Sequence, residues 1–278
     1  MSSKDYLASL FDLSGLTIAI TGGAGVLCGG MGKALSQAGA RIALLDLFDD
    51  KAKAIADEIN TQGGQAVAIK CNVLETASIQ AACDATIKAF GRVDVLINGA
   101  GGNKKEATTS PEMPFFNMPP EAVKWVFDLN ILGTIMPSQV FGKAMADRKQ
   151  GQIVNISSMS AFRPLTRVAA YSAAKAAVSN FTQWLAVHIA QEYSTNIRVN
   201  AIAPGFFLTE QNRFLLTDEK TGALTPRGQK IIDHTPMGKF GVPDDLMGGL
   251  IWLLSPSASF VHGIVLPIDG GFAAYSGV

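Results

Sequence analysis

The feature of this sequence that most restricts its fold is a regular alternation of short apolar runs with longer segments of helical period. Seven runs rich in valine, isoleucine, leucine and alanine are typical of strands: Leu16–Thr21, Arg41–Asp46, Ala66–Asn72, Val93–Asn98, Gln152–Ser157, Ile197–Ala203 and Gly263–Ile268. Helical periodicity lies between them, near Gly30–Gln37, Asp50–Thr61, Thr76–Phe90, Pro120–Asp147, Ala169–Tyr193 and Pro243–Leu254. Strands that alternate with helices form parallel sheets covered on both faces, so the pattern predicts a doubly wound α/β fold with a seven-stranded parallel sheet.

The length and charge of the chain indicate one domain that acts on small molecules. Its 278 residues, 48% of them hydrophobic, are enough for one large α/β domain, and no linker divides residues 1–278. Lysine plus arginine and aspartate plus glutamate each number 23, and no long basic run occurs. Because a nucleic-acid-binding protein needs a positive surface, we expect small molecules or other copies of the chain as partners.

The cysteines and the amino-terminal residues indicate a cytoplasmic protein without metal. Cys28, Cys71 and Cys83 are odd in number and lack metal-ligand spacing, which argues against a disulfide framework and against a zinc site. Residues 1–12 lack the basic start and apolar core of a secretion signal. No run reaches the roughly 18 apolar residues of a membrane span, so membrane contact is not expected.

A glycine-rich segment, Thr21–Gly32, joins the first predicted strand to a helix. Glycines at such a turn let backbone N–H groups and the positive helix end approach a pyrophosphate, which predicts a Rossmann-type nucleotide site. A turn that merely joins strand to helix is the alternative. Asp46 lies 24 residues after Gly22, at the end of the second strand. Its carboxylate would accept hydrogen bonds from ribose hydroxyls and repel a 2′-phosphate, so NAD is favoured over NADP, unless Asp46 is only a polar strand end.

Two long segments interrupt the alternation. Gly101–Pro119 is polar and holds three prolines, and residues 205–241 form a long connection that we expect to be the substrate loop. Loops of this length in a compact domain often have a function. Both follow the carboxyl ends of strands, where open α/β sheets bind their ligands.

Tyr171 and Lys175 lie four residues apart on a predicted helix, which places both side chains on one face. A nearby ammonium favours the phenolate, so we expect Lys175 to lower the pKa of Tyr171. Such a phenol can exchange a proton with an alcohol or a carbonyl. The pair alone also arises by chance, and its ordinary interpretation is a solvated lysine near a packed tyrosine.

The ordered motifs make the chain similar to the short-chain dehydrogenase/reductase family, from about Leu13 to the carboxyl terminus. They are the glycine-rich loop, Asn98–Gly101, Asn130, Ser158, Tyr171, Lys175 and Pro204–Gly205. The resemblance implies a catalytic tetrad of Asn130, Ser158, Tyr171 and Lys175. In it Tyr171 is the acid/base, Lys175 lowers its pKa, Ser158 rather than Ser157 positions the substrate oxygen, and Asn130 anchors a water.

The cofactor contacts expected from the motifs and the resemblance cover several segments. They are Gly22, Gly25, Val26, Leu27, Asp46, Asn72, Val73, Asn98, Gly99, Ala100, Gly101, Tyr171, Lys175, Pro204, Gly205, Phe207 and Thr209. The chain departs from the family pattern where Val26 and Cys28 replace glycines and where Asn72 replaces an aspartate.

The loop T-G-G-x-G-V-L and the tail Asp269–Val278 resemble, more narrowly, the short-chain fructuronate reductases, or D-mannonate oxidoreductases. The expected activity is NAD(H)-dependent hydride transfer between a secondary alcohol and a ketone of a sugar acid, preferably D-mannonate and D-fructuronate. A gluconate 5-dehydrogenase or another polyol or ketone reductase is the alternative. A non-catalytic NAD-binding regulatory protein is the alternative of another class.

A sugar acid needs a cation for its carboxylate. Lys104, Arg163 and Arg213 are the candidates beside Ser158 for substrate contact, and Asn103, Lys105, Arg167 and Arg227 also lie in the relevant segments. The three histidines, His188, His234 and His262, have no partner at metal-ligand spacing. The resemblance also implies a homotetramer, formed through the helix around Trp184–Ile189 and the tail Gly271–Val278.

Overall fold

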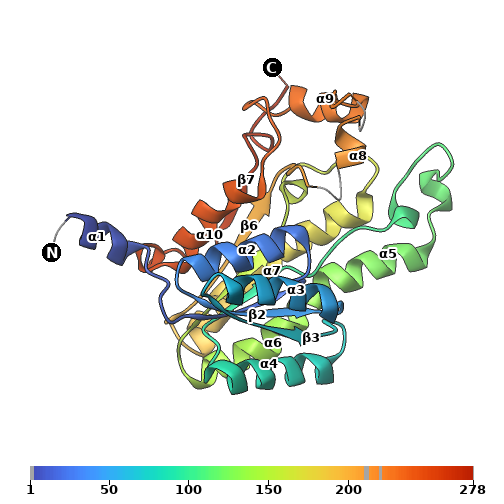
Figure 1. Ribbon diagram of the computed structural model, residues 1–278. Helices are drawn as coiled ribbons and strands as arrows, with labels where there is room; N and C mark the ends of the chain where they lie inside the picture. Colours follow the sequence, from blue (N-terminus) through green and yellow to red (C-terminus); the bar gives the residue numbers. More distant parts are fainter. Residues whose placement is uncertain (1–2, 210–212, 219–220, 278) are drawn as a thin grey trace.

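The computed structural model, which describes residues 3–209, 213–218 and 221–277, has a parallel seven-stranded sheet at its centre (Figure 1). The strand order is β3-β2-β1-β4-β5-β6-β7, and every neighbouring pair is parallel. The strands are β1 (Thr17–Thr21), β2 (Arg41–Asp46), β3 (Gln65–Lys70), β4 (Val95–Asn98), β5 (Gly151–Ile156), β6 (Ile197–Pro204) and β7 (Val265–Ile268). The predicted fold class is therefore confirmed.

Helices cover both faces of the sheet. They are α1 (Ser3–Leu10), α2 (Val26–Gln37), α3 (Asp49–Thr61), α4 (Thr76–Phe90), α5 (Pro120–Phe127), α6 (Gly133–Asp147), α7 (Ala169–Glu192), α8 (Arg213–Leu216), α9 (Pro226–Asp233) and α10 (Met247–Leu254). One buried cluster joins the sheet to α2, α3 and α10, and a second joins it to α4, α6 and α7. The central strands are buried on both faces, which explains why they are apolar throughout and do not alternate.

Several predicted boundaries are wrong. Helix α2 begins at Val26 and not at Gly30, because Gly25 is an extended N-cap and the later glycines let the helix pack closely on the sheet. The predicted helix Pro120–Asp147 is divided by a π-helical turn, Asp128–Leu132. The connection 205–241 contains α8 and α9, and α1 was not predicted.

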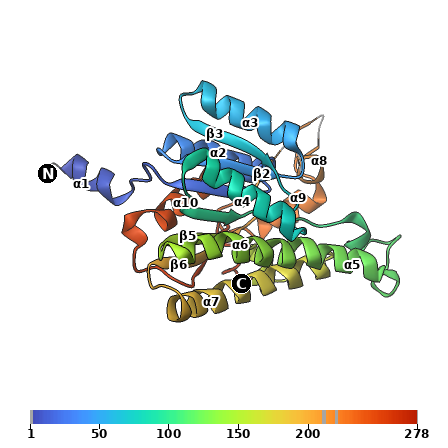
Figure 2. The same ribbon diagram turned by 90° about the horizontal axis from the view of Figure 1, so that it is seen from below.

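Helix α1 projects from the body of the molecule (Figures 1 and 2). Its Tyr6 and Leu7 side chains are exposed. Within the ranges that the structure describes, no helix combines the length and apolar character that crossing a bilayer requires.

The chain reverses its winding direction between β1 and β4, and at such a point open α/β sheets bind their ligands in the crevice outside the carboxyl ends of the strands. Thr21 lies opposite Asn98 in the sheet, and its Oγ1 accepts hydrogen bonds from the N–H groups of Gly99 (3.1 Å) and Ala100 (3.2 Å). Gly22 has φ +68°, and a Cβ there would lie 2.9 Å from the Ala100 backbone. Glycine is therefore required for the close approach of the two loops that flank the crevice.

The face of α7 predicted for self-association is exposed. Trp184 and Val187 are 56% and 57% exposed, and Trp184 stacks on His188 with ring centres 4.7 Å apart. A cavity of about 560 Å³ lies between this face and α6. The homotetramer itself stays a prediction.

Candidate active site

The glycine-rich loop and Asp46 form one end of the crevice. Asp46 is 9% exposed; its Oδ2 accepts the Ala24 N–H and its Oδ1 the Phe48 N–H, both at 2.9 Å. The carboxylate thus ties the loop to the end of β2, a structural role that the sequence did not indicate. Each oxygen keeps a lone pair for a further donor. The first N–H groups of α2 have no side-chain cap, because Gly25 is its N-cap.

The two departures from the family glycines differ in their surroundings. Val26 is exposed at the start of α2. Cys28 is buried against Gly99, and a Cβ added to Gly99 would collide with the Cys28 sulfur. Burial raises the pKa of the Cys28 thiol to about 12, so this thiol is protonated and unreactive at neutral pH. Cys28 therefore packs the loop against the segment that follows β4.

The predicted cofactor contacts after β3 and at the end of β4 have side chains that bond to or pack against other parts of the protein. Asn72 donates from Nδ2 to Glu75 Oε1 (2.7 Å), and Val73 is buried against Gly133. The Asn98 Nδ2 donates to Ser138 Oγ (2.9 Å) and to Asn155 Oδ1 (2.8 Å). The Asn98 side chain therefore points into the protein, and only the backbone of Asn98–Gly101 is available to form a cofactor floor.

Asn130 lies in the π-helical turn and fixes the loop after β4. Its Nδ2 donates to the carbonyls of Gly102 and Val126, both at 2.7 Å, and its Oδ1 accepts the Gly102 N–H at 3.2 Å. A Cβ on Gly101 would lie 2.7 Å from this Oδ1 and 3.2 Å from the Lys175 Nζ. Asn130, Gly101 and Lys175 are therefore adjacent.

Lys175 is a buried cation, only 5% exposed. Its Nζ donates to the Ile156 carbonyl at 2.8 Å and lies 5.7 Å from the centre of the Tyr171 ring. Burial lowers the pKa of Lys175 to about 8. Among the ion pairs of the described residues, none includes Lys175.

The predicted effect of Lys175 on Tyr171 is wrong for this structure. Burial raises the pKa of Tyr171, and a hydrogen bond with Ser158 acts in the opposite direction. The ammonium binds the Ile156 carbonyl and lies beside the ring, so it does not offset the loss of hydration around the phenol.

The two adjacent serines, Ser157 and Ser158, have different partners in the structure. Ser157 Oγ donates to the Lys175 carbonyl (3.1 Å) and lies 2.7 Å from Ser179 Oγ, so it anchors α7 to the sheet. Ser158 caps a short 3-10 helix, Met159–Ala161, and its hydroxyl is the one that meets Tyr171. The role of Ser158 in positioning the substrate oxygen stays a prediction.

The predicted cofactor contacts near the end of β6 differ in their surroundings. The Gly205 N–H donates to the Ile268 carbonyl (2.9 Å), and a Cβ on Gly205 would lie 2.6 Å from the Asp269 Cα, so Pro204–Gly205 packs tightly beside β7. Phe207 is 5% exposed and belongs to the core around α2 and α10. Thr209 lies beyond it and accepts, through its carbonyl, the Arg213 N–H.

A basic pocket of about 420 Å³ lies beside the segment that connects Ser158 to Tyr171. Its walls come from the segment between Ser158 and Tyr171, from Phe206, from α9 and from Phe272. Figure 1 shows α9 beside the carboxyl-terminal segment. The cations that line this pocket, here called the basic pocket, are Arg163, Arg167, Arg227 and Lys230, and His234 also lines it.

Of the predicted substrate contacts, Arg163 lines the basic pocket, and its Nε donates to the Ala273 carbonyl at 3.2 Å. The Lys104 ammonium instead lies 5.5 Å above the Trp125 ring on α5. Neither Lys104 nor Arg213 lines the pocket. Lys230 was not predicted, although its helical spacing from Arg227 and His234 could have indicated it.

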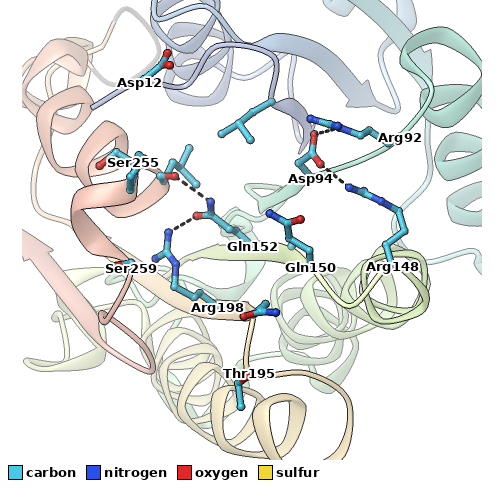
Figure 3. Close-up of a pocket in the computed structure, with 15 residues that line it drawn as sticks. Asp12, Arg92, Asp94, Arg148, Gln150, Gln152, Thr195, Arg198, Ser255 and Ser259 are labelled. Atoms are coloured by element: carbon cyan, nitrogen blue, oxygen red, sulfur yellow. Dashed lines mark hydrogen bonds and ion pairs between the residues drawn. The ribbon is translucent and has the colours of Figure 1, made fainter. Parts of the chain in front are cut away.

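A larger cavity, about 720 Å³, lies at the opposite edge of the sheet (Figure 3). It is lined at the amino ends of the strands by Asp94, Gln152 and Arg198. Asp94 accepts hydrogen bonds from Arg92 and Arg148, both at 2.9 Å, and from the Thr17 N–H. No predicted site residue lines this cavity, so its size does not identify the reaction site.

Comparison with known proteins agrees with this fold. Residues 16–220 match the family described as short chain dehydrogenase. The chain is 48% identical over 276 residues to UxuB, an uncharacterized oxidoreductase of Bacillus subtilis strain 168, with 96% of this chain and 98% of the relative covered.

Two solved structures are also similar. One, from Haemophilus influenzae, is described as a candidate D-mannonate oxidoreductase with bound NAD. It is 47% identical in sequence and has a TM-score of 0.92, and the match covers 98% of this chain and 100% of that one. The other is a gluconate 5-dehydrogenase of Burkholderia cenocepacia in complex with NADP and tartrate; it is 29% identical, with a TM-score of 0.86 and coverage of 97% of this chain and 99% of that one.

Proposed function

The chain belongs to the short-chain dehydrogenase family, and from this premise we propose that it interconverts the ketone and secondary alcohol of a sugar acid with NAD(H) as cofactor. D-Fructuronate and D-mannonate are the preferred pair, and a gluconate 5-dehydrogenase activity is the second candidate. The observation that carries the proposal is a pocket lined by four cations, one wall of which is the segment between Ser158 and Tyr171 and is hydrogen-bonded to Ser172 on α7. The names of the two similar solved structures support it.

The residues of the site have distinct roles in the proposed reaction. Tyr171 donates a proton to the carbonyl oxygen during reduction and accepts one during oxidation. Burial raises the pKa of Tyr171, so the phenol is protonated at neutral pH, which is the state that reduction needs. Ser158 holds the same substrate oxygen by hydrogen bonding, and Asn130 fixes the loop beside Lys175.

The crevice fits a nicotinamide dinucleotide. The loop of Gly22 and Gly25 leaves its backbone open, the N–H groups at the start of α2 would hold the pyrophosphate, and Asp46 would accept the ribose hydroxyls. When bound, the cofactor supplies or accepts the hydride. Fold and family support NAD or NADP; the preference for NAD rests on the charge of Asp46.

We predict that Asp46→Asn weakens this preference. The amide keeps an acceptor for a neighbouring backbone N–H but removes the negative charge that would repel a 2′-phosphate, so the ratio of NADH to NADPH affinity should fall by about tenfold or more. Fluorescence titration with each cofactor measures the ratio. Asp57→Asn, on the exposed face of α3, is the control and should leave it unchanged. An unaltered ratio in Asp46→Asn would remove this residue from the selection of cofactor.

The substrate assignment is tested by following NADH oxidation with D-fructuronate, 5-keto-D-gluconate, D-fructose and cyclohexanone. We expect the acidic sugars to have kcat/KM at least about tenfold above the neutral sugar, because a desolvated arginine–carboxylate contact is a strong interaction. Equal values for acidic and neutral sugars would contradict the sugar-acid assignment. A protein that binds NADH and reduces none of them would be a nucleotide-binding protein without this activity.

A further inference from the structure

The cavity of about 720 Å³ at the amino ends of the strands, here called the amino-end cavity, is separate from the catalytic residues. Asp94 directly precedes β4, and Gln152 and Arg198 lie near the starts of β5 and β6. Ser158 instead follows the carboxyl end of β5. A molecule in the amino-end cavity therefore lies at the opposite edge of the sheet from Ser158 and is not placed for reaction there.

Arg198 is a half-buried cation without a carboxylate partner. Its Nη2 donates to Gln152 Oε1 at 2.7 Å and its Nη1 to the Val261 carbonyl at 3.4 Å, and both acceptors are neutral. None of the ion pairs within the described ranges includes Arg198. Burial lowers the pKa of Arg198, because the charge loses hydration and gains no counter-charge in return. A bound anion would supply that counter-charge.

Gln152 holds the Arg198 guanidinium in position. The two residues are direct neighbours in the register of β5 and β6. The Gln152 Nε2 donates to the Leu254 carbonyl at 2.9 Å, which turns its Oε1 toward Arg198. A guanidinium has more N–H donors than its bonds to Gln152 and Val261 use, so donors of Arg198 remain for a ligand.

A second positive group of the amino-end cavity is centred on Asp94. Its carboxylate accepts hydrogen bonds from Arg92 Nε and from Arg148 Nη2, both at 2.9 Å. The Arg148 Nη1 also donates to the Val93 carbonyl at 2.7 Å, which fixes this side chain. One carboxylate therefore serves two guanidinium groups, and the group keeps a net positive charge.

The positive groups lie on two sides of the cavity. Figure 3 shows Arg148 and Arg198 apart, with Gln152 between them. Together the cavity has three guanidinium groups and one carboxylate paired with them, an excess of two positive charges before Asp12 is counted. Asp12 is exposed, and its Oδ1 accepts the Ser14 N–H at 2.9 Å. A phosphate monoester carries about −1.5 to −2 charges at pH 7, which matches this excess.

The rest of the lining suits a hydroxylated molecule. In the part of the chain that the structure describes, no hydrogen bond uses the side chain of Gln150, Thr195, Asn196 or Ser259, which all line the cavity. Amides and hydroxyls both donate and accept hydrogen bonds, as the hydroxyls of a sugar do. The volume also lies within the range of roughly 300–1,000 Å³ that is usual for small-molecule sites.

From this arrangement we propose that the amino-end cavity is a second binding site, for a phosphorylated sugar or polyol. Arg198 and the guanidinium groups beside Asp94 hold the phosphate, and the unpaired amides and hydroxyls hold the sugar. The site is separate from the reductase reaction and does not depend on the proposed function.

Isothermal titration calorimetry with D-glucose 6-phosphate, D-glucose and inorganic phosphate tests this site. The full chain is used with saturating NADH, so that the nucleotide crevice is occupied. We expect saturable binding of D-glucose 6-phosphate with a dissociation constant below about 1 mM, and affinities at least about tenfold lower for D-glucose and for phosphate. Absence of saturable binding would overturn the proposal. Equal affinity for phosphate and D-glucose 6-phosphate would show that the sugar is not recognised, and would overturn the assigned ligand class.

Variants locate the bound phosphate. Arg198→Met should weaken binding of D-glucose 6-phosphate by about tenfold or more, because a charge-assisted contact is lost. Arg227→Met, in the basic pocket, is the matched control and should leave the dissociation constant within about twofold. The reverse pattern would place the phosphate in the basic pocket and contradict a site at the amino ends of the strands.

Two exposed residues give a test that does not depend on the bonds of Arg198 within the fold. Thr195→Val and Ser259→Ala remove hydroxyls from exposed positions, and thermal unfolding checks that each variant is folded. Each should weaken binding of D-glucose 6-phosphate by about threefold or more and leave that of inorganic phosphate unchanged, since only a hydrogen bond to the sugar is lost. Unaltered affinity for the sugar phosphate in both folded variants would mean that these hydroxyls do not hold the sugar, and the proposed site would be wrong.

Discussion

Tyr171→Phe is expected to reduce kcat by about 10³-fold while leaving the dissociation constant for NADH within about twofold, since general acid catalysis contributes roughly 10²–10⁴-fold. The substitution removes one hydroxyl and keeps the buried ring. Without the phenol, the oxygen of the reduced substrate has no proton donor at the position where Ser158 would hold it. Stopped-flow measurement of NADH oxidation at saturating substrate, with fluorescence titration of NADH, separates turnover from binding.

Tyr193→Phe is the control for this experiment, because Tyr193 lies on the same chain segment just after α7 and is exposed. It should keep wild-type turnover. Full activity in Tyr171→Phe would refute the acid/base assignment. A loss of NADH binding equal to the loss of turnover would make the tyrosine a cofactor contact and not a proton donor.

The fold could be predicted because its strands and helices carry strong local signals. Helix α4 has the predicted bounds, and β2 also matches, because each is one uninterrupted apolar or amphipathic segment. The π-helical turn at Asn130 could not be predicted, because one extra residue in a helix hardly alters the apolar spacing on either side. Its position depends on the bonds between the Asn130 side chain and Gly102, a tertiary contact.

The candidate site could be predicted in part for a similar reason. Motif order is enough to bring Ser158, Tyr171 and Lys175 together, because strand ends and one helix face fix their positions. The pKa of Tyr171 depends instead on how much water surrounds the phenol, and sequence spacing says nothing of burial. The position of Lys104 above Trp125 depends likewise on how the loop 101–119 packs against α5.

The basic pocket was missed for a further reason. It joins segments far apart in the chain, the 163–167 loop, α9 and Phe272. Single cations in polar loops resemble ordinary surface charges, and only the assembled fold shows that four of them surround one cavity.

Lys175→Met is expected to lower turnover sharply and, at pH 7, to leave the protein at least as stable as the wild type. Lys175 is buried, and burial lowers its pKa to about 8 from an unfolded value of 10.5. The folded state therefore disfavours the charged ammonium, and methionine of similar length removes that cost. Against this gain stands the loss of the hydrogen bond to the Ile156 carbonyl, which contributes about 1 kcal/mol.

The pH dependence follows from the same pKa difference. Between pH 8 and pH 10.5 the unfolded chain binds a proton that the folded chain has released, so the stability of the wild type rises with pH through this interval. Below pH 8 the cost of burying the charge is present in full. The stability advantage of Lys175→Met should therefore be largest below pH 8 and disappear above pH 10.5, as measured by urea unfolding at a series of pH values.

Turnover should move in the opposite direction to stability. The ammonium lies beside the Tyr171 ring and next to Gly101 and Asn130, so we expect kcat to fall by at least about 10²-fold in Lys175→Met. Lys88→Met, an exposed lysine on α4, is the control and should change neither stability nor turnover by a measurable amount. A Lys175→Met protein that is clearly less stable at pH 7 would mean that the lysine holds the fold together, and one that keeps its activity would mean that catalysis does not use this buried charge.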